Sequence, residues 1–144
     1  MAVRSKQMEK TQTALESTLE SVDEAEAIVV RFAEKLGFDE DTAQQVGMAV
    51  RETMVNAVVH GNRYNRNKKV HLDVEGVNGG IAVMIGDEGE GFDASSVPDP
   101  LAPENLLKQS GRGMLLIRAF TDEFDLHPRS GGGMEARLFK SLPG

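Results

Sequence analysis

Two stretches in the first half of the chain have the apolar spacing of amphipathic helices. The first is "EAEAIVVRFAEKL", residues 24–36, and the second starts near "DEDTAQQV" and runs to His60. Gly37 and Gly61 follow these stretches and are expected to end the helices. Before them, residues 13–22 alternate weakly, which predicts a strand at the edge of a sheet.

The second half of the chain predicts mostly strands. Residues 69–77 and 81–87 flank Asn78-Gly79-Gly80, a turn made from residues that tolerate positive φ, so they predict a hairpin. The other predictions are a helix cap at Ser21 or Asp23, a long Gly, Pro and Ser-containing loop over 88–113, a helix over 114–120, and strands over 122–127 and 134–142. This order predicts an α/β (α+β) two-layer sandwich, with helices on one face of a mainly antiparallel sheet.

Composition narrows the kind of protein. A chain of 144 residues is expected to form a single domain over residues 1–144, with the polar residues 1–12 as a disordered start. No stretch is apolar enough to span a membrane and no secretory signal is visible, so we expect a cytoplasmic protein. Zero cysteines exclude disulfides and thiolate zinc. The net charge of −7 opposes direct binding to nucleic acid.

A polar stripe runs along the second predicted helix. Residues four apart are nearly aligned on an α-helix, so Glu52, Asn56 and His60 share one side, next to an apolar stripe. A half-buried polar atom without a partner costs on the order of 1–3 kcal/mol, so these groups need partners. The residues alone leave three alternatives open. The polar groups have a functional role, they form hydrogen bonds to nearby backbone, or Glu52 and His60 share a metal ion, although strong metal ligands are few.

Two glycine-containing motifs add candidate chemistry. In "IGDEGEGFDA", residues 85–94 have the letters of the dinucleotide fingerprint, but four carboxylates would surround the pyrophosphate and no helix can follow. One alternative is that these residues form an ordinary acidic turn. The other is that they bind a ligand with a neutral ring, and Asp87 then accepts a hydrogen bond from an amine such as that of adenine. In "SGRGMLLIRAF", Gly111 and Gly113 precede an apolar helix and Arg112 adds charge, which favours an anion there or a simple turn cap.

Taken together, the three motifs identify a family. "ETMVNAVVHGN", "DEGEGF" and "GRGMLLI" resemble, in order and spacing, the N box and the two glycine boxes of the GHKL superfamily of ATP-binding proteins, which includes gyrase and histidine kinases. Within it, the short anti-sigma-factor serine kinases of the RsbW and SpoIIAB type look most similar. The resemblance covers roughly residues 15–142 and implies a Bergerat-type ATP-binding fold with a mobile ATP lid.

The resemblance also implies roles for particular residues. Asn56 matches the asparagine that ligates Mg²⁺, and a carboxamide oxygen suits that hard cation. Glu52 matches the catalytic acidic residue that orients or deprotonates the attacking hydroxyl. Asp87 matches the aspartate that reads adenine. The other cofactor-binding positions are His60, Gly89, Gly91, Gly111, Arg112, Gly113 and Met114, with Gly89 and Gly91 as close-approach glycines and Gly111 and Gly113 at the lid.

Some positions depart from the family pattern or lack a known role. Met134 and Glu135 stand where the last strand often has threonine near the adenine, which leaves adenine recognition resting more on Asp87. Arg51 precedes the catalytic glutamate where serine is frequent. Asn62 follows the family's "HG" pattern, with no role assigned to it.

Chain length then separates the functions known in the superfamily. Gyrase-like and chaperone-like proteins need a further domain, and histidine kinases need a helical phosphoacceptor hairpin, whereas only about 20 residues precede the first predicted helix. The resemblance therefore implies an ATP- and Mg²⁺-dependent kinase that phosphorylates a Ser/Thr of an anti-anti-sigma (STAS) protein and also sequesters a sigma factor. A non-catalytic, nucleotide-gated protein-binding switch and a detached histidine-kinase-like module are the alternatives, and a homodimer is left open.

Overall fold

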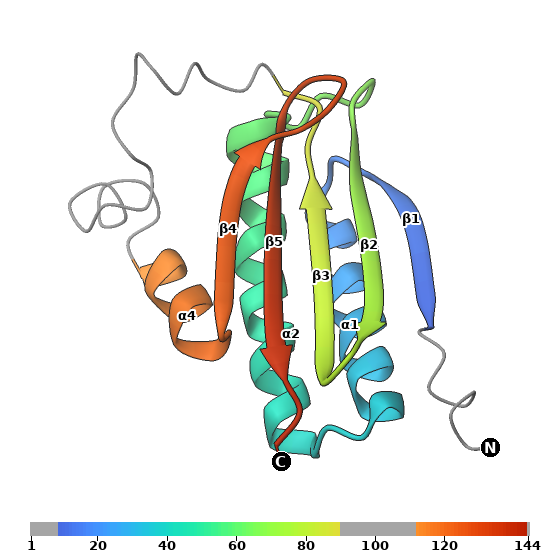
Figure 1. Ribbon diagram of the computed structural model, residues 1–144. Helices are drawn as coiled ribbons and strands as arrows, with labels where there is room; N and C mark the ends of the chain where they lie inside the picture. Colours follow the sequence, from blue (N-terminus) through green and yellow to red (C-terminus); the bar gives the residue numbers. More distant parts are fainter. Residues whose placement is uncertain (1–8, 90–111, 144) are drawn as a thin grey trace.

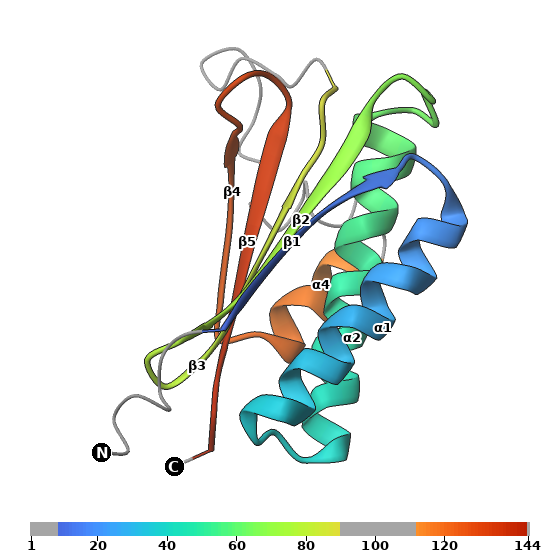
Figure 2. The same cartoon turned by 90° about the vertical axis from the view of Figure 1, so that its right-hand side faces the viewer.

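The computed structural model describes residues 9–89 and 112–143. In this part of the chain one sheet carries its helices on a single face (Figures 1 and 2). The elements in chain order are β1 (Lys10–Glu16), α1 (Leu19–Leu36), α2 (Glu40–Val55), the π-helix η2 (Asn56–Gly61), β2 (Lys69–Val77), β3 (Gly80–Gly86), α4 (Arg112–Phe120), β4 (Glu123–Pro128) and β5 (Met134–Ser141). The predicted two-layer fold is confirmed. None of the helices in the described ranges is long and apolar enough to cross a membrane.

The five-stranded sheet has the order β1-β2-β3-β5-β4, and each pair of neighbours is antiparallel. The hairpin between β2 and β3 closes with Val77 opposite Gly80, around the predicted Asn-Gly turn. At the other end of β3, Gly86 pairs with Glu135 of β5. The residues that follow β3 therefore lie beside the start of β5, although almost fifty positions separate them in the sequence.

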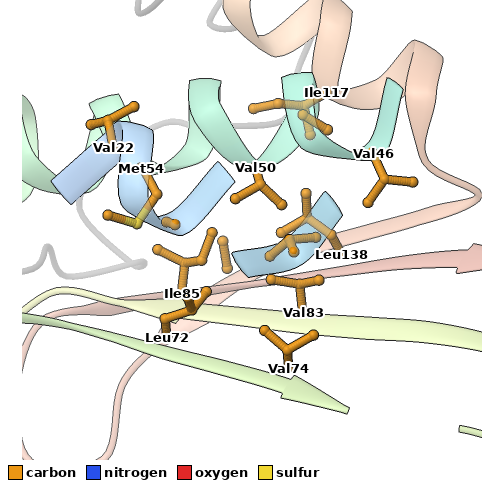
Figure 3. Packing of buried hydrophobic residues seen from close by; sticks show 14 of the residues in the cluster. Val22, Val46, Val50, Met54, Leu72, Val74, Val83, Ile85, Ile117 and Leu138 are labelled. Atoms are coloured by element: carbon orange, nitrogen blue, oxygen red, sulfur yellow. The ribbon is translucent and has the colours of Figure 1, made fainter. Parts of the chain in front are cut away.

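Alternation along the strands and periodicity along the helices build a single core. Every second residue of β2 is buried, and inward side chains of β2, β3 and β5 meet those of α2 (Figure 3). The labelled core residues include Val46, Val50 and Met54 from α2, Leu72 and Val74 from β2, and Val83, Ile85 and Leu138 from β3 and β5. Burying each such side chain contributes about 1.5–3 kcal/mol. This packing fixes α2 across the sheet, with α1 and α4 on its two sides (Figure 1).

The start of the chain differs from the sequence prediction. β1 begins at Lys10, so residues 10–12 form a strand and the expected disorder of 1–12 is wrong there; residues 1–8 lie outside the described part. The helix cap is also earlier than expected, because Thr18 caps α1 and its Oγ1 accepts a hydrogen bond from Ser21 N at 3.3 Å. Ser21 is itself buried inside the helix.

The end of the second helix also differs. The predicted α-helix through His60 stops at Val55, and Asn56–Gly61 is a π-helix, in which Asn62 N donates to Ala57 O at 2.8 Å. The i→i+5 hydrogen bonds add a residue to each turn, so Asn56 and His60 do not follow α-helical alignment. Gly37 ends α1 with φ +110° as predicted, whereas after η2 the left-handed residues are Arg63 and Tyr64 rather than Gly61.

The sheet face opposite the helices is polar and hydrogen-bonded. His127 of β4 lies between Asp125 Oδ2, 2.6 Å from its Nδ1, and Glu135 Oε1, 2.9 Å from its Nε2. The pKa of His127 is raised, first by the hydrogen bond to Glu135 and then by Asp125. The side chain of Glu135 thus lies on this outer face of the sheet, while that of its neighbour Met134 faces the helices.

Candidate functional site

A cavity of about 580 Å³ opens between η2, the end of β3 and strands β4 and β5. Of the residues predicted for cofactor binding, Asn56, His60, Asp87 and Met114 line it. The remaining lining residues are Thr53, Ala57, Gly61, Asn62, Arg63, Asn65, Lys68, Ile85, Phe124, Leu126, Met134 and Ala136. Residues from the N box, the first glycine motif and α4 therefore meet around one space.

Asp87 provides a fixed acceptor inside this cavity. The residue is only 7% exposed, and its Oδ1 accepts hydrogen bonds from Gly89 N at 2.9 Å and Met134 N at 3.2 Å. Its own backbone N–H donates to Met134 O at 2.9 Å. No donor in the described ranges reaches Oδ2, and no buried side-chain oxygen there lacks a partner, so Oδ2 is accessible from the cavity. The carboxylate is held by one oxygen and offers the other.

Glycines let the backbone pack closely around Asp87. A Cβ on Gly61 would collide with Asp87 Oδ2, and a Cβ on Gly89 would collide with the carbonyl oxygen of Gly61. Gly89 therefore packs against the end of η2 and does not line the cavity, and its predicted close approach to a nucleotide stays a prediction. Gly133 completes the set, because a Cβ there would strike the carbonyl of Asp87.

Asn62 joins four chain segments beneath this turn. The side chain is 2% exposed, and its Oδ1 accepts from Glu88 N at 2.7 Å. Its Nδ2 donates to Ser17 Oγ and to Lys69 O, both at 2.9 Å. Ser17 Oγ in turn donates to Lys68 O at 2.5 Å. Every polar atom of the amide is used, so Asn62 fixes the turn that carries Asp87 relative to η2, β2 and the start of α1.

Glu88 points away from the cavity, as alternation after a strand requires. Its carboxylate accepts from Lys69 N at 3.2 Å and lies 2.5 Å from His71 Nε2. The pKa of Glu88 is lowered, first by the hydrogen bond from His71 and then by that from Lys69 N–H. Of the four carboxylates that argued against a pyrophosphate here, Asp87 faces the cavity and Glu88 does not; Glu90 and Asp93 lie outside the described residues.

Asn56 connects η2 with α4. Its Nδ2 donates to Met114 Sδ at 3.8 Å, and Met114 is 4% exposed. No donor among residues 9–89 and 112–143 binds Oδ1, which leaves this hard oxygen available in the cavity wall. The described residues contain no cluster of three or more His, Cys, Asp or Glu suited to a metal. Of the two residues of the metal site considered from sequence, His60 lines the cavity and Glu52 does not.

Glu52 lies one helical turn before Asn56 but does not line the cavity. The side chain is half-buried and makes no ion pair in the described part of the chain. The neighbouring Arg51 is committed elsewhere, because its Nη1 binds Asp23 at 2.6 Å and Glu26 at 2.9 Å on α1. The hydrogen bond to Asp23, followed by that to Glu26, raises the pKa of Arg51. Glu52 therefore keeps a carboxylate without an ion pair in the described residues, next in sequence to Thr53, which lines the cavity.

The second glycine motif is described only in part. Gly91 and Gly111 lie outside the described residues, as does the predicted lid up to residue 111. α4 begins at Arg112, so Gly113 is a buried residue inside the helix rather than one that precedes it. The backbone of Arg112 starts the helix.

Several lining residues were not predicted from sequence. Arg63, Asn65 and Lys68 form part of the rim, and the run "RYNRNKK" is the signal that could have indicated them. Phe124 and Leu126 of β4 form apolar wall, as do Met134 and Ala136 of β5. Met134 thus occupies the wall where threonine was expected, and its backbone, rather than its side chain, holds Asp87.

Sequence comparison extends this picture. The family described as the histidine kinase-like ATPase domain matches residues 15–140. A serine-protein kinase RsbW from Oceanobacillus iheyensis is 28% identical over 105 residues, which cover 69% of this chain and 66% of that protein. The RsbW of Staphylococcus epidermidis is 30% identical over 106 residues, covering 67% of this chain and 65% of that protein. The matches span slightly less than two thirds of the length of these curated relatives.

Comparison of folds points the same way. The crystal structure of the RsbU and RsbW domains of Rv1364c from Mycobacterium tuberculosis superposes with a TM-score of 0.66 and 17% identity. The match covers 93% of this chain and 32% of that one. At this identity the similarity concerns the fold alone.

Proposed function

The chain belongs to the histidine kinase-like ATPase family, and on that premise we propose that it binds ATP in the cavity and phosphorylates a serine or threonine of a protein partner. The observation that carries this proposal is the placement of Asp87 Oδ2 and Asn56 in one cavity wall. The first is an acceptor for an amine and the second a ligand for a hard cation. Together they match the two ends of a metal-bound adenine nucleotide.

The cavity has the properties that an adenine nucleotide needs. Its volume of about 580 Å³ lies within the usual range for small-molecule sites, roughly 300–1,000 Å³. Apolar side chains such as Phe124 and Leu126 suit a flat ring, and the buried Asp87 gives that ring one orientation by accepting from its amine. ATP, when bound, supplies the phosphoryl group for transfer.

Asn56 is the residue that fits Mg²⁺. This cation keeps several water ligands and binds through substrate phosphates and few protein oxygens. One carboxamide oxygen with no competing donor satisfies that requirement, and an acidic cluster is not needed. Met114 holds the Asn56 amide by its nitrogen and so orients the oxygen as the ligand.

Glu52 fits the role of the base for the incoming hydroxyl. A residue that acts on a partner's side chain must be reachable from solution, and Glu52 is half-exposed on the turn next to Asn56. Its carboxylate would orient the acceptor hydroxyl and take its proton as the oxygen attacks. Its position outside the cavity lining is consistent with a group that faces the partner rather than the nucleotide.

For the acceptor we propose a small STAS-type anti-anti-sigma protein, with a sigma factor as a second partner and the cytoplasm as the location. Two curated relatives carry the name serine-protein kinase RsbW. The competing function is a nucleotide-gated switch without catalysis, which the placement of Glu52 outside the cavity would also allow.

Phosphate transfer separates the two functions. The purified chain should be incubated with Mg²⁺ and radiolabelled ATP, together with STAS proteins encoded beside its gene. We expect label on a single serine or threonine of one partner, dependent on Mg²⁺. Tight ATP binding without label on any partner would instead support the switch.

Asn62 is predicted to control nucleotide affinity. Replacing Asn62 by alanine removes the acceptor for Glu88 N, so the turn carrying Asp87 loses its anchor to η2. We expect ATP affinity to fall roughly tenfold, since a lost buried hydrogen bond costs about 1–3 kcal/mol, and the protein to unfold at a lower temperature. Titration calorimetry and thermal unfolding measure the two effects.

Ser17→Ala is the matched control for Asn62. It removes one partner of the Asn62 amide and the bond to Lys68 O but keeps the bond to Glu88. We expect it to lower stability with little change in ATP affinity. Equal losses of affinity in both variants would show that the network acts only through overall stability.

A further inference from the structure

The segment after η2 concentrates positive charge. Residues 63–69, here called the basic loop, contain Arg63, Arg66, Lys68 and Lys69. The rest of the chain has 12 basic against 23 acidic residues. The loop is therefore a local cationic patch on a strongly acidic protein, at the upper end of α2 and η2 in Figure 1.

The cations of the basic loop form no ion pair with an acidic side chain of the described residues. Across residues 9–89 and 112–143, Arg51, Arg137 and Lys140 form ion pairs, but none of the four basic side chains in the loop does. Acidic residues outnumber basic ones in this chain, so charged neighbours could readily have neutralised them. Arg63 and Arg66 are instead exposed to solvent, and Lys68 and Lys69 are half-buried.

The loop also carries backbone strain. Arg63 and Tyr64 have φ of 53° and 59°, and in the described ranges they are the only residues other than glycine with positive φ. The conformation is held by backbone hydrogen bonds, from Tyr64 N to Val58 O at 3.0 Å and from Asn65 N to Asn62 O at 3.0 Å. Tyr64 is nonetheless 50% exposed. A strained backbone that presents an exposed tyrosine between arginines indicates a functional surface.

The triphosphate is not the anion that this loop faces. Gly61 packs directly against Asp87, so the basic loop adjoins the end of the cavity that reads adenine. Asn56 and Met114, which fit the metal and the phosphates, lie at the start of η2 and in α4. Arg66 does not line the cavity at all. Arg63 and Lys68 do line this end of the cavity, so the charge left for a second ligand is that of Arg66 and Lys69.

We propose that the basic loop is the docking site for an acidic segment of a partner protein, with Tyr64 as its aromatic contact. Tyrosine and arginine are enriched in protein interfaces, and opposite charge guides association. A long nucleic acid would also meet the rest of the protein, which carries 23 acidic against 12 basic residues, whereas a short acidic segment needs to meet only the loop. This docking does not require phosphate transfer.

The test uses the full chain, a fluorescent decaglutamate peptide and low salt. The variant Arg66→Glu reverses one charge in the loop, and Arg31→Glu reverses one on the exposed face of α1. We expect Arg66→Glu to weaken peptide binding roughly fivefold or more, and Arg31→Glu to have less than half that effect. Amide chemical shifts should change mainly in residues 62–69. Equal effects of the two variants, or shifts centred elsewhere, would overturn the proposal.

Tyr64→Gly supplies an independent check. Glycine adopts positive φ without strain, so this variant should unfold at a higher temperature and yet bind the peptide more weakly. If Tyr64 had only a structural role, the Tyr64→Gly variant would unfold at a lower temperature and bind the peptide as the wild type does. Single-stranded DNA of the same charge serves as the comparison ligand, and tighter binding of DNA than of decaglutamate would also overturn the proposal. ATP affinity, measured alongside, should not change in Arg66→Glu, and it tests the proposed function separately.

Discussion

Replacing Asp87 by asparagine should lower ATP affinity by roughly 10²-fold or more, because a site built to accept a hydrogen bond strongly rejects a mismatched one. Oδ1 of Asp87 accepts from two backbone N–H groups, those of Gly89 and Met134. The amide oxygen of asparagine will take over these bonds. The new NH₂ group then occupies the place of Oδ2 and points a donor at the amine of adenine. Titration calorimetry with ATP measures the loss.

The fold should survive this change, since the bonds that hold the turn are kept. Asp122→Asn is a suitable control, because Asp122 does not line the cavity and its Oδ2 likewise accepts two hydrogen bonds, from Ser141 N and Oγ, both at 2.7 Å. The control should bind ATP as the wild type does. Unchanged affinity in Asp87→Asn would remove Asp87 from adenine recognition, and loss of cooperative thermal unfolding in it would point to a structural role.

Elements with strong local signals were predictable from the sequence. The strand β2, Lys69–Val77, was predicted with its bounds, since alternation and an Asn-Gly turn act within a few residues. Gly37 ends α1 for an equally local reason. The first strand was predicted over 13–22, so its start was three residues and its end six residues too late, because this edge strand is mostly polar and depends on pairing with the distant β2. The last predicted residues, 19–22, belong to α1. Pairing of that kind leaves little trace in local composition.

The π-helix could not be predicted from periodicity. "NAVVHG" continues the apolar spacing of α2, and nothing in its composition distinguishes α-helical from π-helical hydrogen bonding. The structure shows what accompanies the extra residue: Gly61 lies against Asp87, and Asn62 reaches Ser17, Lys69 and Glu88. These contacts join segments far apart in sequence, and they fix the position of the residues that form the cavity wall.

The motifs predicted which residues meet but not how. Asn56, Asp87 and Met114 come together as the family resemblance implied. The residues that support Asp87 were not predicted. The roles of Asn62 and Gly133 depend on contacts with the backbone of Glu88 and Asp87, which only the folded chain brings to them. Glu52 was expected on the same stripe as Asn56, yet only Asn56 lines the cavity. Whether Glu52 acts in transfer remains a prediction.

Replacing Glu52 by glutamine should therefore reduce phosphate transfer by roughly 10²-fold or more while leaving Mg-ATP affinity almost unchanged. Glutamine keeps the shape of the side chain but removes the base and its negative charge. Nucleotide affinity should hold because Glu52 does not line the cavity, and its carboxylate makes no hydrogen bond to Asn56 or Asp87 in the described structure. The backbone hydrogen bond from Asn56 N to Glu52 O is kept in the variant. Initial rates of transfer to the partner, measured beside nucleotide calorimetry, give both quantities.

Asn56→Ala should behave differently, because it removes the proposed metal ligand and so weakens both Mg²⁺-dependent ATP binding and transfer. Glu24→Gln, an exposed position on α1, controls for the loss of one negative charge and should change neither. A split between affinity and rate in Glu52→Gln, with no such split in Asn56→Ala, would assign the base and the metal ligand to adjacent turns of one helix. Transfer at the wild-type rate in Glu52→Gln would exclude Glu52 as the base and direct attention to another acceptor of the hydroxyl proton.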